Sequence, residues 1–180
     1  EKFRLSRLIA VIDLPNGVKK GTTGGYVQSV KNIHDYAWVG DEAFVYGKAV
    51  VEGLAQVLGK SEVYDNARVS GQVILRDEVK IHGSAKLSGN LLIMDSAEVY
   101  ECASVSGTGR IQQKAIIGGR CKISGHILIS GQADIGGETN IFGSHLITDQ
   151  VTIRGHSILL GSLLLKGHRR YINLQLNNRL

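Results

Sequence analysis

Residues 45–74 read VYGKAV, VEGLAQ, VLGKSE, VYDNAR and VSGQVI, so that a valine returns at every sixth position. The same phase runs without a break from Val27 to Leu165, with Val, Ile or Leu at 24 consecutive steps. Such residues make up roughly a fifth of an ordinary chain, so chance does not explain a run of this length. We number the positions of each repeat as slots one to six, beginning with the aliphatic residue.

The other slots predict a strand and a corner in each repeat. Slot three is Gly or Asp in 21 of the 24 repeats, with Ser29, Glu101 and Gln113 as the exceptions, and slot five is mostly small. Gly and Asp tolerate the positive φ of a tight corner. Because side chains alternate along a strand, slots five and one point inward, and slots six and two point outward.

Three strands and three corners make one coil of 18 residues. Stacked coils pair as parallel strands about 4.8 Å apart, with the aliphatic residues filling the interior. The sequence therefore predicts an all-β fold, a single-stranded parallel β-helix of about eight coils. At that spacing it forms a rod on the order of 38 Å long.

The repeats resemble those of the left-handed β-helix family, and the hand is implied by that resemblance alone. The first segment narrows the resemblance to a smaller group of proteins. Its informative stretches are Lys2 to Ser6, Leu8 to Asp13 and Val18 to Val27. These stretches, with Val-Tyr-Gly-Lys-Ala at Val45 to Ala49, resemble YdcK-like bacterial and phage-associated proteins. That family is grouped by fold with trimeric LpxA-like acyltransferases. The resemblance implies an acetyltransferase that uses acetyl-CoA or another acyl-CoA, with a histidine base between subunits.

The extent of the repeat divides the chain into three segments. Residues 1–26 form an N-terminal cap, in which Leu8 to Leu14 is a strand and Pro15 to Gly17 a turn. Residues 27–170 form the β-helix, which stops where Arg169 occupies an inward slot. Residues 171–180 form a C-terminal tail that folds back, and its apolar side chains cover the last coil, namely Leu174, Leu176 and Leu180.

Charge and composition exclude several classes of function. The net charge is +5, but residues 1–31 and 166–180 carry +4 each and residues 32–165 carry −3. No basic stripe with interleaved aromatics runs along the coils, so we expect no nucleic-acid partner. No apolar run approaches the roughly 18 residues of a membrane span, and no secretory signal is evident. Two cysteines, Cys102 and Cys121, form no disulfide framework and suit a reducing cytoplasm.

One outward column pair is apolar and predicts an oligomer. Exposed apolar surface on this scale marks an interface, and this fold often trimerises, so we expect a homo-oligomer and favour a trimer. The alternative is that the C-terminal tail covers the stripe. The stripe is interrupted by Arg110 and Gln112, and consists of Trp38, Leu58, Ile74, Leu92, Met94, Leu128, Leu146 and Leu164.

Two other columns could bind a partner. Slot two stacks Tyr46, Tyr64, His82 and Tyr100 on successive coils. Rings at this spacing stack and stabilise the β-helix, or they form a platform for a carbohydrate or a peptide. A second column holds serines, which either bind a regular polar surface or are simply solvated: Ser70, Ser88, Ser106 and Ser124.

The candidate catalytic pair is His156 with Glu138, in one corner column with Cys102 and Arg120. Glu138 could orient the imidazole as a base, although a plain surface charge ladder explains the same residues. His126, beside Thr108 and Ser144, is a weaker candidate, and His145 occupies an inward slot as a neutral core residue.

We predict no metal site. Asp77 and Asp95 stack in slot three, but aspartate is common there for backbone reasons. The leading interpretation is a structural or binding module with no cofactor and a protein or glycan partner. The alternative is an acyl-CoA-dependent acyltransferase with sites between subunits.

Overall fold

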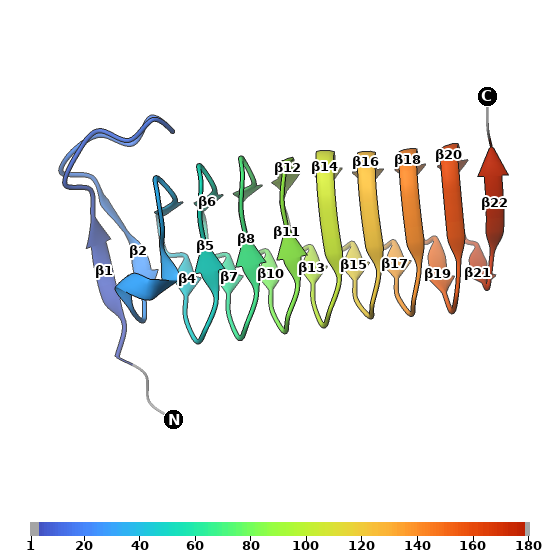
Figure 1. Cartoon of the computed structure of the whole chain (residues 1–180), viewed down its shortest axis with the longest axis horizontal. Coiled ribbons are helices and arrows are strands. Elements are labelled where there is room, and N and C mark those ends of the chain that lie inside the picture. The colour runs from blue at the N-terminus through green and yellow to red at the C-terminus, as the bar shows by residue number, and fades with distance from the viewer. Residues whose placement is uncertain (1–3, 179–180) are drawn as a thin grey trace.

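The computed structural model describes residues 4–178 and shows a parallel β-solenoid of about eight turns, each of about 18 residues. The coils lie side by side along a straight rod, with the N-terminal segment at one end (Figure 1). Among the described residues the only helix is a short 3-10 helix, η1 (Val30–Asn32). It is far too short to cross a membrane, and no other described segment is helical. The predicted fold class is confirmed.

One flat side of the rod is a ten-stranded sheet, which we call the aromatic face. Its strands are parallel apart from the first pair, which is antiparallel. In spatial order they are β1 (Ser6–Ile9), β2 (Thr23–Val27), β4 (Phe44–Val45), β7 (Glu62–Val63), β10 (Lys80–Ile81), β13 (Glu98–Val99), β15 (Ile116–Ile117), β17 (Asp134–Ile135), β19 (Thr152–Arg154) and β21 (Arg170–Ile172).

The other two sides share a twelve-stranded sheet. The apolar face begins with β3 (Trp38–Val39), β6 (Gln56–Val57), β9 (Ile74–Leu75) and β12 (Asn90–Ile93). The hydroxyl face begins with β5 (Val50–Val51), β8 (Arg68–Val69) and β11 (Lys86–Leu87). Longer strands then span both faces, namely β14 (Ser104–Ile111), β16 (Lys122–Ile129), β18 (Asn140–Ile147) and β20 (Ile158–Leu165), followed by β22 (Gln175–Asn178).

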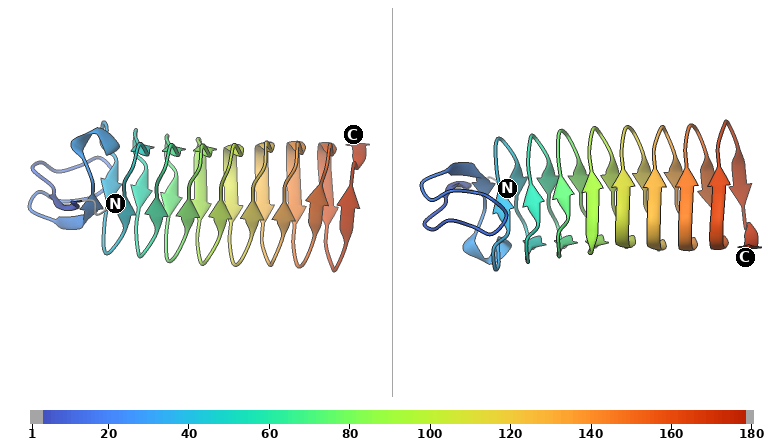
Figure 2. Two further views of the ribbon diagram at one scale, coloured as in Figure 1. Left: turned by 90° about the horizontal axis from the view of Figure 1, so that it is seen from below. Right: turned by 90° about the horizontal axis from the view of Figure 1, so that it is seen from above.

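The joined strands arise at a corner made only of glycine. Gly107, Gly125 and Gly143 have φ of 108°, 116° and 131°, whereas the tighter corner at Gly59 has 69°. The strand continues through this bend in the later coils, as their unbroken arrows show (Figure 2). Only glycine fits, because a Cβ on Gly107 would lie 2.2 Å from the carbonyl oxygen of Gly125.

The interior follows the repeat as predicted. Every slot-one side chain from Val39 to Leu165 is buried, and most slot-five side chains are buried too, with alanine the commonest residue there. At the corners, aspartates adopt positive φ and their carboxylates accept a hydrogen bond from the next coil. The amide of Gly59 donates to Asp41 at 2.8 Å, and the amide of Asp95 donates to Asp77 at 3.1 Å. The slot-three aspartates therefore bind backbone amides.

The two ends of the rod are built differently. At the N-terminus, β1 pairs with β2, and Trp38 lies against Gly24, so its ring is buried. At the C-terminus the structure differs from the expected fold-back. Residues 170–178 continue the coil as β21 and β22, beside β19 and β20. Leu174 packs on the core, while Leu180 lies outside the described residues.

Candidate functional site

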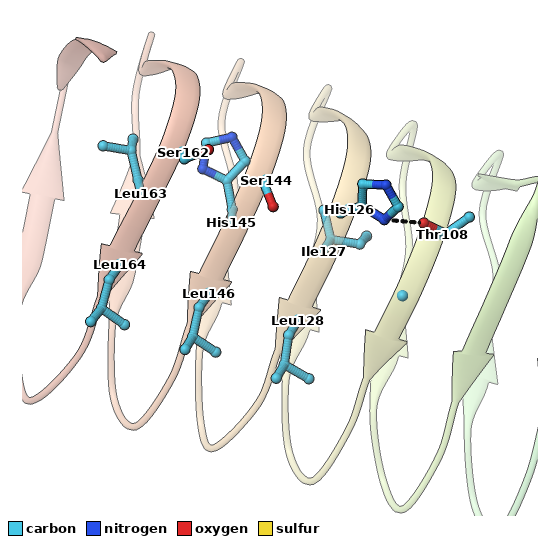
Figure 3. Close-up of a pocket in the computed structure, with 11 residues that line it drawn as sticks. Thr108, His126, Ile127, Leu128, Ser144, His145, Leu146, Ser162, Leu163 and Leu164 are labelled. Carbon is cyan, nitrogen blue, oxygen red and sulfur yellow. Dashed lines mark hydrogen bonds between the residues drawn. The ribbon is translucent and has the colours of Figure 1, made fainter. Parts of the chain in front are cut away.

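A shallow groove of about 500 Å³ crosses β14, β16, β18 and β20 near the glycine corner. Its upper edge carries Thr108, His126, Ser144 and Ser162, and its lower edge carries Leu128, Leu146 and Leu164 (Figure 3). Thr108 Oγ1 and His126 Nδ1 are hydrogen bonded at 2.6 Å. The parallel register brings these side chains together, since Thr108 pairs with His126 and His126 with Ser144. The groove thus joins a polar row to the exposed leucines of the apolar face.

His145 also contributes to this region, but its ring is buried. Only 3 % of the residue is exposed, and neither ring nitrogen makes a hydrogen bond. Its neighbours in register are Ile127 and Leu163. Burial disfavours the charged imidazole and lowers the pKa of His145, which keeps it neutral. This environment fits the core residue expected from the inward slot.

The structure brings His156 and Glu138 together at a corner. His156 Nδ1 lies 3.0 Å from Glu138 Oε2, and Arg120 Nη1 lies 3.8 Å from Glu138 Oε1. A carboxylate on Nδ1 leaves Nε2 available as a base. However, the side chains of His156 and Glu138 are 77 % and 52 % exposed. The pair has the geometry of a base and its orienting group, without the enclosure that excludes water from a reaction.

The aromatic column forms a continuous stack. Ring centroids are 5.1 Å apart for Tyr46 and Tyr64, 4.8 Å for Tyr64 and His82, and 5.5 Å for His82 and Tyr100. The Tyr46 hydroxyl donates to Glu62 at 3.0 Å. Burial and this carboxylate together raise the pKa of Tyr46.

The ring faces in this column are turned toward one another, so a sugar or peptide would meet mainly ring edges. His82 Nε2 also donates to Glu98 at 2.7 Å, which ties the ring to the sheet. This geometry favours stabilisation of the coils over a ligand platform.

Two glycines beyond Tyr100 mark a contact that the sequence analysis missed. Gly118 and Gly136 occupy slot two without positive φ, so the backbone does not require glycine there. Tyr100 lies over Gly118 and Arg154 over Gly136, where a Cβ would overlap the covering side chain. Arg154 pairs with both oxygens of Asp134 at 2.5 and 2.6 Å, and this pairing raises the pKa of the guanidinium. The sequence did contain a signal for this contact, because glycine occupies two successive slot-two positions and leaves room for a neighbouring side chain.

In the structure, all but one of the side chains in the apolar stripe reach the surface. Trp38 is buried by the N-terminal cap, so the surface open to a partner begins at Leu58. Leu128, Leu146 and Leu164 are 38 %, 36 % and 56 % exposed, and the rest are half-buried, namely Leu58, Ile74, Leu92 and Met94. The C-terminal strand lies beside β20 at the end of the rod, so residues 175–178 do not cover the stripe.

Residues 4–178 contain no cluster of His, Cys, Asp or Glu able to hold a metal ion. Both cysteines are free thiols, with Cys102 exposed and Cys121 buried. The Cys121 thiol donates to the Gly118 carbonyl at 2.8 Å, and burial raises its pKa to about 11. Cys121 is therefore a protonated core residue at neutral pH.

A scan against protein-family models found no family that matches the chain, and a search of curated proteins found no relative. The function is therefore inferred from the geometry of the faces.

Proposed function

We propose that this protein is a non-catalytic structural or binding module that self-associates through its apolar face. The observation that carries the proposal is the row of three leucines in register, Leu128, Leu146 and Leu164, exposed on successive coils. Large apolar side chains that gather on one flat face usually mark an interface. Full burial of an exposed Leu side chain contributes roughly 1.5–3 kcal/mol, so each of these partly exposed leucines contributes a part of that when a second copy covers it.

We propose that the coil is left-handed, as in the trimeric hexapeptide-repeat proteins. We also propose that three copies of the chain associate around the apolar stripe. The support is the unbroken six-residue phase and its Gly or Asp corners. The other faces remain available for a protein or glycan partner.

Light scattering over a range of protein concentrations tests self-association. The informative variant is Leu128→Ser with Leu146→Ser, and the control is Ile116→Ser with Ile158→Ser, because those isoleucines are similarly exposed on other faces. We expect an oligomer for the parent and the control, and a monomer for the leucine variant. A monomeric parent, or equal dissociation of both variants, contradicts the proposal.

An acyl-CoA-dependent acyltransferase is the second candidate, favoured by the 3.0 Å contact between His156 and Glu138. A ligand that binds only the native state raises the unfolding midpoint. A saturable rise with acetyl-CoA, accompanied by an acetyl transfer that His156→Ala abolishes, establishes the enzyme. An unchanged midpoint at saturating acetyl-CoA leaves the binding module as the better account.

A further inference from the structure

The hydroxyl face is cationic and polar over its four central coils. Residues 66–72, 84–90, 102–108 and 120–126 contain no acidic and no aromatic residue. Apart from Cys102 and His126, the outward side chains fall into three kinds. They comprise the cations Arg68, Lys86, Arg120 and Lys122, the hydroxyls Ser70, Ser84, Ser88, Ser104, Ser106, Thr108 and Ser124, and the amides Asn66, Gln72 and Asn90.

The parallel register arranges these groups as a regular array. Lys86 pairs with Arg68 on one side and with Ser104 on the other, and Ser104 pairs with Lys122. Neighbouring positions in such a column are about 4.8 Å apart. The face therefore presents donors at even intervals along the rod axis.

Within residues 4–178, Arg120 is the one cation of this face that forms an ion pair, with Glu138 at 3.8 Å. Arg68, Lys86 and Lys122 are exposed and form no ion pair within residues 4–178. At one edge, Asp65 and Glu101 accept hydrogen bonds from the amides of Gly83 and Gly119, at 3.1 and 2.5 Å. The repeat region as a whole is mildly acidic, so the positive charge is local to this face.

We propose that the hydroxyl face binds a linear acidic polysaccharide. Its carboxylate or sulfate groups pair with Arg68, Lys86 and Lys122, and its hydroxyls bond the serine and amide side chains. Single-stranded nucleic acid is a poorer match, because its binding sites use aromatic rings on which bases stack. The proposal is independent of self-association, since the leucine stripe belongs to the neighbouring face.

The probes are polygalacturonate oligomers, which carry only carboxylates, chondroitin sulfate, which carries both groups, and uncharged dextran. The test variant is Arg68→Ser with Lys86→Ser and Lys122→Ser, because serine already occupies the same slot at Ser104. The control is Lys80→Ser with Lys114→Ser and Lys166→Ser, which removes the same charge from exposed positions elsewhere. Circular dichroism establishes that each variant is folded.

We expect the parent and the control to bind at least one acidic polysaccharide, and none of the proteins to bind dextran. The face variant binds at least about fivefold more weakly, as the loss of three exposed charge contacts implies. Comparison of polygalacturonate with chondroitin sulfate then identifies the anionic group. Three results would overturn the proposal. They are equal weakening of binding in both triple variants, no binding of either acidic polymer, and tighter binding of DNA at equal charge.

Discussion

Replacement of His145 by leucine should stabilise the protein. The imidazole is 3 % exposed, and both ring nitrogens lack hydrogen bonds. An unsatisfied buried polar group costs about 1–3 kcal/mol. Leucine already fills the equivalent position of the next coil at Leu163, so the substitution removes this cost at a packing penalty of less than about 1.5 kcal/mol. We expect a net gain of about 1–2 kcal/mol in the free energy of unfolding at pH 8.

The gain should grow as the pH falls. The folded-state pKa of His145 is lowered, whereas an unfolded histidine titrates near its ordinary value of about 6.5. Below that value the unfolded chain binds a proton that the folded chain excludes. This group therefore lowers stability by up to about 1.4 kcal/mol per pH unit, until the folded-state pKa is reached. The leucine variant lacks this contribution.

Urea unfolding followed by far-ultraviolet circular dichroism at pH 8, 7, 6 and 5 measures both effects. His168→Leu is the control, because that histidine is exposed and hydrogen bonds the uncharged Gln150, so its loss leaves the core and the ion pairs unchanged. A His145→Leu variant less stable than the parent at pH 8, or a difference that stays constant down to pH 5, would refute the reasoning.

Three further predictions concern single positions. Gly118→Ala should destabilise by about 1–3 kcal/mol in thermal unfolding, because its Cβ meets the Tyr100 ring, and Tyr100→Ala should relieve most of this loss. Asp95→Ala should lower the free energy of unfolding by about 1–2 kcal/mol, since it removes a corner hydrogen bond and leaves alanine at φ of 61°. Asp95→Gly should lower it less, because glycine tolerates that φ. Equal losses in the two variants would contradict this account. In a thiol titration at pH 7, Cys102 should react in the native protein and Cys121 only after denaturation, so two rapidly reacting thiols would be inconsistent with the burial of Cys121.

The sequence predicted the fold well because one repeating pattern fixes both the core and the corners. The six-residue phase places every aliphatic residue inward, and the choice of Gly or Asp identifies each corner. It did not predict the joined strands, since a glycine column allows a wide or a tight corner equally. The burial of Trp38 was also missed, because it depends on how the N-terminal cap folds back onto the first coil.

The candidate sites were predicted less completely. Stepping by one coil placed His156 beside Glu138 and the aromatic rings in one stack, since register alone decides these contacts. Arg154 extends over Gly136 to Asp134, which lies on the adjacent coil but two residues out of register, so stepping by one coil did not predict this contact. The direction of long side chains is set by local packing, which a repeat does not encode.

The equivalence of the corners makes the rod unusually permissive toward changes in length. Loss of a whole 18-residue coil would leave every downstream column in its original line, and the carboxylate of one corner would meet the amide of another. Loss of a single repeat of six would also preserve the core, but it would rotate everything downstream by one face. The exposed leucines would then continue the line of a different column. In such a protein, small insertions and deletions reassign surfaces without unfolding the chain, which gives evolution a way to recombine binding faces on a constant interior.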